Sequence, residues 1–229
     1  MVTHESARDL LSAEGRIPVF PLPNVVLFPH ASLPLHIFEP RYRAMTREAL
    51  KGGRLIAMAL LKPGWEEGYD GSPEVHRIAC AGLIEDEVRL PDGRFNIRLR
   101  GLSRVEILEF VQDHPYRVAS VRILQDLNEG DGPEVEEEKR RLLSSCASLL
   151  QELSGRPGTS FALDGDIPLV ALVNSLCQNL ALDSATKQTL LETGDIVLRC
   201  RRLVAILNER WREIALLQAT SETPGGGVH

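Results

Sequence analysis

Residues 20–45 read FPLPNVVLFPHASLPLHIFEPRYRAM and combine two features that usually exclude each other. Six of the chain's fourteen prolines fall within residues 18–40, yet the residues between them are mostly Val, Leu, Ile and Phe, which favour buried strands. Proline cannot donate a backbone hydrogen bond to a neighbouring strand, so it is confined to sheet edges, strand starts and bulges. The stretch therefore predicts short strands broken by bends, not one flat sheet.

The first half of the chain, up to about Leu124, continues this pattern. Short apolar runs alternate with turn residues, as in β-strands. Strands are predicted at residues 17–20, 25–28, 33–38, 54–61, 77–84 and 116–124. A helix interrupts them, because Pro40 suits a first helical position and Gly52-Gly53 ends the apolar periodicity that follows.

A hairpin is predicted around Asp92-Gly93, and the side chains that share a face predict its register. The predicted pairs are Leu90–Phe95, Val88–Ile97 and Asp86–Leu99 on the apolar face, and Glu87–Arg98 and Glu85–Arg100 on the charged face. A two-residue turn and a four-residue loop that frees Pro91 both keep this register. Asp86 does not fit an apolar face, which suggests a bulge at that position.

The second half of the chain changes to a helical period after the turn residues NEGDGP at 128–133. Apolar side chains then recur at helical spacing, with acidic residues where helices begin. Helices are predicted from Glu134 to Leu153, after Asp166, after Asp183 and after Gly194-Asp195. Residues 155–165 are predicted to form a loop, and residues 220–229 a disordered tail.

Composition excludes several classes of protein. With 43% hydrophobic and 25% charged residues and a net charge of −6, the chain is typical of a globular protein and lacks the basic surplus of a nucleic-acid or anionic-membrane binder. The four cysteines are far apart and form no C-x-x-C pair, so they predict neither disulfides nor a zinc site. No signal peptide or transmembrane segment is visible, so we expect a cytoplasmic protein.

Motifs that carry chemistry are also missing from the sequence. No phosphate-binding loop, dinucleotide fingerprint, H-E-x-x-H or G-x-S-x-G occurs. His30 and His36 lie in an apolar region, where a structural histidine is the expected role. Glu85-Asp86-Glu87 resembles a carboxylate cluster, but the predicted hairpin gives it arginine partners on a solvated face. We therefore expect no enzyme activity, cofactor or metal.

Two groups of arginines and one loop remain as candidate contact surfaces. The arginines at 89, 94, 98, 100 and 104 resemble a nucleic-acid stripe, although Phe95 faces inward in the predicted register. Those at 199, 201, 202, 210 and 212 are predicted to form the solvated face of the last helix. The loop KPGWEEGYDGSPE (62–74) displays Trp65 and Tyr69, which suit protein recognition unless Trp65 instead covers a sheet edge.

The proline-rich stretch at residues 20–45 also resembles part of a known protein family. PLPNVVLFP (21–29), LPLHIF (33–38) and the helix after Glu39 are similar to the start of the N-terminal, substrate-binding domain of Lon proteases, which also occurs in cereblon. Residues 76–124 and LALDSATKQTLLET (180–193) are similar to later parts of that domain. The chain resembles a standalone member that lacks the ATPase and peptidase domains.

The resemblance implies an α+β protein with a PUA-like β pseudo-barrel followed by a helical bundle. The implied divisions are an N-terminal arm (1–15), the β subdomain (16–127), the bundle (133–219) and the tail (220–229). It also implies a non-enzymatic module that holds exposed segments of other proteins or a specific partner, linked to a protease system and not to a membrane. Phe28, Leu35, Trp65 and Tyr69 are the predicted contact residues. The alternative is an RNA- or nucleotide-binding protein, since PUA-like folds elsewhere bind RNA.

Overall fold

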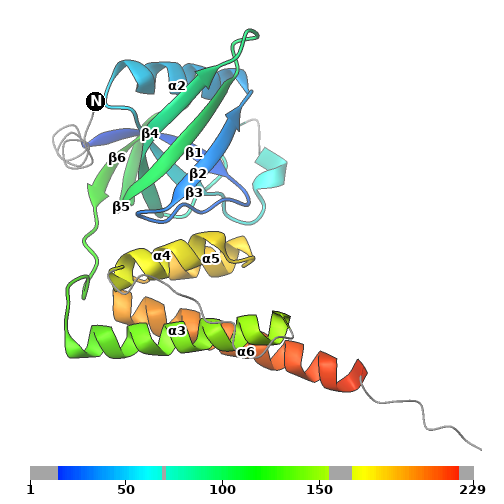
Figure 1. Ribbon diagram of the computed structural model, residues 1–229. Helices are drawn as coiled ribbons and strands as arrows, with labels where there is room; N and C mark the ends of the chain where they lie inside the picture. Colours follow the sequence, from blue (N-terminus) through cyan, green and yellow to red (C-terminus); the bar gives the residue numbers. More distant parts are fainter. Residues whose placement is uncertain (1–14, 69–70, 155–166, 222–229) are drawn as a thin grey trace, which may run out of the picture. The chain divides into compact units, whose positions relative to one another are not determined.

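The computed structural model describes residues 15–68, 71–154 and 167–221, and it shows the expected α+β protein (Figure 1). The elements follow the chain as β1 (Arg16–Leu22), β2 (Ser32–Ile37), α2 (Pro40–Lys51), β3 (Leu55–Leu60), the 3-10 helix η1 (Trp65–Gly68), β4 (Ile78–Arg89), β5 (Phe95–Gln112), β6 (Arg117–Ile123), α3 (Pro133–Ser154), α4 (Leu169–Asn179), α5 (Ser184–Glu192) and α6 (Ile196–Ser221). The predicted loop at 155–165, the cap at Asp166 and residues 222–229 of the predicted tail lie outside the described residues.

The described residues divide into two compact units that do not follow a single cut in the sequence. Within the described residues, one unit combines those of 15–126 with 174–194, and the other combines those of 127–173 with 195–221. The first unit therefore holds all the strands, α2, α5 and the end of α4. The helical region expected at 133–219 is divided between the two units, with α5 and the end of α4 in the first and with α3 and α6 in the second.

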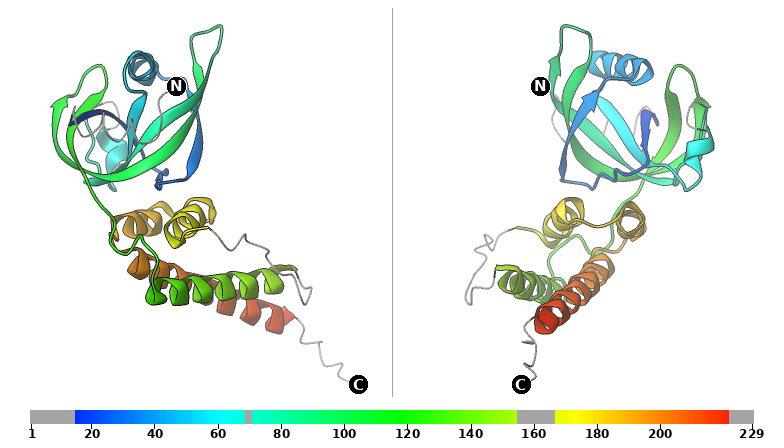
Figure 2. Two further views of the ribbon diagram at one scale, coloured as in Figure 1. Left: turned by 60° about the vertical axis from the view of Figure 1, so that its left-hand side comes forward. Right: turned by 90° about the vertical axis from the view of Figure 1, so that its right-hand side faces the viewer.

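The strands of the first unit close into a barrel (Figure 2). Neighbouring strands run in the order β2-β5-β4-β3-β1-β6, and a further pairing of β5 with β6 closes the ring. The pair of β1 with β3 is parallel, and the other pairs are antiparallel. The closure depends on β5, which is long enough to pair with β2 at its start and with β6 at its end.

The residues predicted as a strand at 25–28 instead form a buried irregular segment, so that prediction was wrong. This segment runs across a point where Gly82 of β4 lies opposite Gly101 of β5. A Cβ on Gly101 would lie 2.0 Å from the backbone oxygen of Phe28. Glycine here lets the two backbones approach, and His30 N donates to Gly101 O over 2.9 Å. The apolar side chains are buried as in a strand, but their backbone crosses the barrel wall.

Helix α2 lies across one end of the barrel and begins as predicted, with Pro40 in its first turn (Figure 2). Its apolar side chains face the barrel, since Tyr42, Met45 and Ala49 are all buried. They belong to a core cluster with residues of β1 to β5, while a second cluster fills the barrel between its strands. The helix ends at Lys51, before the predicted Gly52-Gly53 stop.

The β4–β5 hairpin forms, but its register differs from the prediction by one residue. The observed pairs include Arg89–Phe95, Val88–Asn96, Glu87–Ile97 and Asp86–Arg98, followed by Ile84–Leu99. The change in register between Ile84 and Asp86 marks the bulge that was predicted there. Phe95 is buried as predicted, but Val88 is 59% exposed, because the shift moves it to the outer face.

Asp183 and Asp195, which precede the last two predicted helices, both cap the helices that follow them. Asp183 accepts hydrogen bonds from Thr186 N (2.8 Å) and Thr186 Oγ1 (2.6 Å), and these bonds hold the pKa of Asp183 below its ordinary value. Asp195 accepts from Leu198 N over 3.1 Å at the start of α6. These acids satisfy backbone N–H groups that have no partner within the helix.

The second unit is built on α3 and α6, which pack side by side and run in the same direction (Figure 1). Arg201 of α6 donates to Glu138 (2.9 Å) and Glu134 (2.8 Å) of α3. Arg199 was predicted on the solvated face of α6, but its side chain is fully buried, so that assignment was wrong. Arg201 and Arg202 are exposed as predicted. Along the described part of the chain, every helix is too short or too polar to span a bilayer.

Candidate functional site

The C-terminal half of β5 extends beyond its pairing with the neighbouring strand β4. Pairing with β4 ends at Ile78–Glu106, and Ile107 N then donates to Arg77 O over 2.8 Å. Beyond that bond β5 runs on to Gln112, and its ladder partner among the described residues is β6. One edge of the strand is therefore open.

A hollow of about 340 Å³ lies beside this open edge. The segment before β4 (residues 71–77) turns away from β5 and follows the end of β3. Lys62 N donates to Glu74 O (2.8 Å), and His76 N donates to Leu60 O (2.9 Å). The gap between this segment and β5 forms the hollow. Its lining residues are Lys62, Ser72, Glu74, Val75, Arg77, Ile107, Leu108, Glu109, Phe110 and Arg117.

Two bulges in β5 expose aliphatic side chains along the same stretch. The register against β6 shifts between Ile107 and Glu109 and again between Phe110 and Gln112. Leu108 and Val111 are the extra residues at these shifts, and they are 48% and 42% exposed. A bulge turns a side chain away from the regular alternation of a strand. Leu108 is thereby placed on the wall of the hollow instead of in the core.

The rim of the hollow carries charges of both signs. Lys62 Nζ lies 2.8 Å from Glu74 Oε2, and the hydrogen bond and charge of Lys62 lower the pKa of Glu74. Arg77 and Glu109 are exposed and add one further charge of each sign. With Arg117 at the inner wall, the hollow does not form the continuous positive surface that a nucleic-acid backbone requires.

Arg117 forms the wall between the hollow and a smaller pocket. Its Nη1 donates to Pro73 O over 2.7 Å, and its guanidinium carbon lies 3.9 Å from the centroid of the Phe110 ring. Only 12% of the side chain is exposed, and Asp113 Oδ1 lies 3.5 Å from Nε. Burial lowers the pKa of Arg117 from its ordinary value, while Asp113 acts in the opposite direction. The arginine ties the segment before β4 to the barrel.

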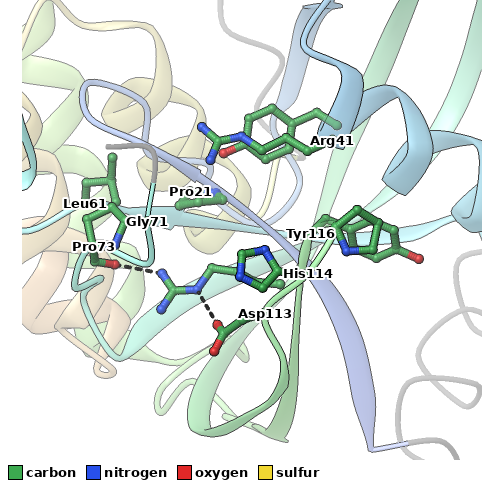
Figure 3. Close-up of a pocket in the computed structure, with 11 residues that line it drawn as sticks. Pro21, Arg41, Leu61, Gly71, Pro73, Asp113, His114 and Tyr116 are labelled. Carbon is green, nitrogen blue, oxygen red and sulfur yellow. Dashed lines mark hydrogen bonds and ion pairs between the residues drawn. The ribbon is translucent and has the colours of Figure 1, made fainter. Parts of the chain in front are cut away.

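The smaller pocket has a volume of about 80 Å³ and lies beyond the end of β5 (Figure 3). Arg117 reaches towards Pro73 and Asp113 within it, and His114 lies beside them (Figure 3). Its lining residues are Pro21, Arg41, Tyr42, Leu61, Gly71, Pro73, Asp113, His114, Pro115, Tyr116 and Arg117. Arg41 donates to Glu39 over 3.0 Å and lies 4.7 Å from the centroid of the Tyr42 ring.

This arrangement is suited to holding a polypeptide. The open edge offers backbone groups, Leu108 and Phe110 offer apolar surface, and Arg117 offers a sheltered charge. Within residues 15–68, 71–154 and 167–221, no three His, Cys, Asp or Glu side chains gather as metal ligands would.

The four contact residues predicted from the sequence are not brought together. Phe28 is fully buried and its ring cannot contact a partner, because the segment around it crosses the barrel wall. Leu35 is half-buried on β2 against the cluster beneath α2. Trp65 is half-buried against the barrel cluster that includes Val75 and Ile107. Tyr69 lies outside the described residues.

The residues that build the hollow were missed in the sequence. Leu108, Phe110 and Arg117 lie in the run ILEFVQDHPYR (107–117), where apolar residues occur in adjacent pairs instead of alternating. Such doubling within a strand is a signal of bulges. That the edge beside them is open cannot be seen locally, because it depends on where β4 begins.

The charged and histidine groups singled out in the sequence have local partners. Arg98 and Arg100 both form ion pairs with Glu85, and Arg54 pairs with Glu87. Arg104 is buried and pairs with Asp126. These contacts confirm a solvated charged face for Glu85–Glu87 and remove Arg104 from any exposed basic stripe.

His36 has hydrogen-bond partners, but it is exposed rather than buried. Its Nδ1 lies 2.7 Å from Asn96 Oδ1, and its Nε2 lies 3.3 Å from Arg94 Nη1. His30 is also exposed and occupies a turn with a φ of 66°. Both therefore lie at the barrel surface.

Comparison with known proteins agrees with the resemblance seen in residues 21–38. Residues 16–209 match the family described as the ATP-dependent protease La (LON) substrate-binding domain. Over 208 residues the chain is 30% identical to the Lon protease of Parabacteroides distasonis, covering 87% of this chain and 24% of that protein. It is 25% identical over 219 residues to the Lon protease of Chloroherpeton thalassium, covering 95% and 26%. The chain thus spans about a quarter of the length of these relatives.

Solved structures show the same fold. A Lon N-terminal domain protein from Xanthomonas campestris matches with a TM-score of 0.61 and 23% identity, covering 83% of this chain and 97% of that one. The N-terminal domain of a Mycobacterium avium complex Lon protease matches with a TM-score of 0.63 and 17% identity, covering 84% and 98%. The chain belongs to the ATP-dependent protease La (LON) substrate-binding domain family.

Proposed function

We propose that this protein binds extended segments of other proteins without altering them chemically, and that the segment lies along the open edge of β5. One observation carries the proposal: β5 continues from Ile107 to Gln112 past its last pair with β4, beside a hollow that can accept a chain. An added strand receives backbone hydrogen bonds from such an edge, and neighbouring side chains give selectivity.

The side chains around the edge favour an unfolded segment with apolar residues. Leu108 and Val111 expose aliphatic surface that an added strand would cover, and the Phe110 ring lies beneath Arg117. Exposed aliphatic groups beside an unpaired edge promote aggregation in many proteins. Here the segment before β4 flanks the edge, which leaves room for a single chain.

Two residues predicted from the sequence keep a place in the proposal. Trp65 packs against the barrel cluster, which also contains Val75 and Ile107 of the lining of the hollow. Leu35 lies on β2, away from the hollow, and we retain it as a second contact for longer segments.

The family name supports a link with a protease system. The relatives that match are Lon proteases, and the matching domain is described as substrate-binding. We infer that the bound segments belong to proteins destined for proteolysis. A reducing cytoplasm suits the chain, whose cysteines are all free thiols.

The test is binding of a permanently unfolded polypeptide, such as reduced and carboxymethylated lactalbumin, to wild-type protein and to Leu108→Ser. Removing half-buried leucine surface from the interface should weaken binding about tenfold. Val88→Ser is the matched control, because Val88 is also an exposed aliphatic residue, at 59%, but lies on the β4–β5 hairpin. Equal loss in the two variants, or no loss in Leu108→Ser, would reject the β5 edge as the site.

The alternative of RNA binding makes a different prediction. Three of the arginines that would contact phosphate are paired with Asp92, Asp86 and Glu85. We therefore expect binding of unfolded polypeptide to depend weakly on salt, and binding of single-stranded RNA to be negligible at physiological salt. RNA affinity that falls steeply with added salt would favour the alternative.

A further inference from the structure

We propose that the pocket beside Arg117 receives the carboxylate of an acidic side chain, located at the N-terminal end of the bound segment. This inference rests on the proposed function, because it assumes that a segment lies along the edge of β5. It adds the chemistry and the position of one anchoring residue.

The guanidinium of Arg117 is the central observation. Its side chain is 12% exposed, and Nη1 donates to Pro73 O over 2.7 Å. Nε is buried and makes no hydrogen bond to the described residues, since Asp113 Oδ1 lies 3.5 Å away. A buried N–H group of a cation without a hydrogen bond is costly, so a further carboxylate placed close to the guanidinium would be stabilising.

The rest of the pocket suits a short acidic side chain. Its volume of about 80 Å³ holds a carboxyl group with one or two methylene groups, since a water molecule takes about 30 Å³ in the liquid. Pro21, Leu61 and Pro73 offer apolar wall for the methylene stem. Arg41 adds a second positive charge, which already has Glu39 as a partner at 3.0 Å.

Asp113 would compete with a ligand carboxylate for the guanidinium of Arg117. Its side chain is half exposed, lines the pocket and supplies the carboxylate nearest to Arg117 Nε. Because the contact is longer than a hydrogen bond, Asp113 neutralises Arg117 without saturating its donors. A ligand carboxylate entering the pocket would be attracted by Arg117 and repelled by Asp113.

The strand direction fixes where the acidic residue falls in the ligand. The pairs of β5 with both β4 and β6 are antiparallel, and we assign the added strand the same antiparallel direction. β5 runs towards Gln112, and Asp113 follows directly. The N-terminal end of an antiparallel ligand therefore lies at the pocket, and its C-terminal end lies near Arg77.

The experiment compares three labelled peptides of alternating Val and Thr by fluorescence anisotropy. One carries Glu at its N-terminal end, one carries Gln there, and one carries Glu at its C-terminal end. We expect the first to bind about fivefold more tightly than the second, because a charge-assisted hydrogen bond replaces a neutral one. The third should bind no better than the second. Equal binding of all three would overturn the inference.

Substitution of Asp113 provides the matched test in the protein. Asp113→Asn should raise the affinity for the N-terminal Glu peptide about threefold and leave the Gln peptide unchanged. Arg117 is kept, because its bond to Pro73 holds the wall of the hollow. Asp131→Asn, at an exposed position in the other unit, is the control and should change neither affinity. An equal change for both peptides in Asp113→Asn would contradict a carboxylate pocket.

Leu108→Ser separates failure of this inference from failure of the proposed function. If Leu108→Ser lowers the affinity for all three peptides, while the peptides with N-terminal Glu and Gln bind equally well, the edge site stands and the pocket assignment is wrong. If it weakens none of them, the edge site falls and the pocket assignment falls with it.

Discussion

The two halves of strand β5 have different neighbours. From Phe95 to Arg100 the strand pairs with β2 on one side and with β4 on the other, and its inward side chains are buried. From Ile107 to Gln112 it pairs with β6, carries two bulges and borders a hollow. The first half joins β2 to β4, whereas the second half closes the barrel through β6 and leaves its other edge open among the described residues, where we propose that another chain binds. One continuous strand thus has two neighbouring strands along its first half and, among the described residues, one along the end of its second half.

The arginines beside the two halves of β5 also differ, in their exposure and in their ion pairs. Beside the first half, Arg98 and Arg100 lie on the outer face and pair with exposed acids, which gives each pair little energy. Beside the second half, Arg117 is sheltered and its compensation by Asp113 is incomplete. Sheltered charges interact more strongly than exposed ones because water screens them less. Of these three arginines, Arg117 is therefore the better candidate to bind a ligand.

The largest expected difference between the halves is in packing. Leu99→Ala in the first half should lower the free energy of unfolding by about 2–5 kcal/mol, because Leu99 is fully buried and its removal leaves a cavity. Leu108→Ala in the second half should cost below about 0.5 kcal/mol, since Leu108 is half exposed. Urea denaturation of both variants measures the contrast. Similar losses would mean that the second half is as integral to the core as the first.

The free energy of unfolding should also be sensitive to substitution of Gly101, which lies at the boundary between the two halves of β5. Gly101→Ala places a Cβ 2.0 Å from the backbone oxygen of Phe28, so the buried segment must move. We expect a loss of about 1–3 kcal/mol of unfolding free energy, measured by the same denaturation. Gly130→Ala is the control, because a Cβ there meets nothing within 4 Å. A loss at Gly101 no greater than at Gly130 would show that the segment is not fixed against the strand.

A smaller effect is expected from the exposed ion pairs of the first half. Arg98→Ala removes contacts with Glu85 and Asp86, and it should cost below about 1 kcal/mol. The cost should shrink further in molar salt, where the screening length falls to about 3 Å. Thermal denaturation at low and high salt measures both values. A large, salt-independent loss would place Arg98 in the same class as the sheltered arginines.

The smallest effect concerns pH at the tip of the hairpin. Asp92 accepts hydrogen bonds from Arg94 N (3.0 Å) and Arg94 Nε (2.6 Å), and the bond from the backbone N–H is the main cause that lowers its pKa below 3.8. A lowered pKa in the folded state means that the stabilisation is present above the unfolded pKa and is lost as pH falls through the folded value. Amide exchange at the tip, corrected for its intrinsic pH dependence, should therefore increase below about pH 4.

Asp92→Asn provides the control for that pH dependence. Its corrected exchange at the tip should be independent of pH over the same window. If wild type and variant respond to acid alike, another carboxylate controls the hairpin.

Much of the fold could be predicted because its signals are local. Pro40 at the start of α2 and the caps Asp183 and Asp195 depend on the few residues that follow them, and each was placed correctly. The alternation of apolar residues also located most of the strands.

Most of the errors concern features of the structure that depend on distant segments of the chain. The hairpin register is the exception, because it differs at the turn itself, where Leu90 N donates to Arg94 O and Gly93 has a φ of 81°; a one-residue shift there exchanges the faces of the hairpin. The segment at 25–28 is apolar because it crosses the Gly82–Gly101 pair, which only the tertiary structure brings beneath it. The open edge of β5 exists because β4 begins at Ile78, so no local pattern in residues 107–112 could reveal it.

Amide hydrogen exchange with and without reduced and carboxymethylated lactalbumin tests the central claim most directly. If an extended segment adds to the open edge, protection should increase from Leu108 to Gln112 and stay unchanged in β2, between Ser32 and Ile37. Increased protection in β2 alone, or no change anywhere in β5 under conditions in which the polypeptide is bound, would contradict the account.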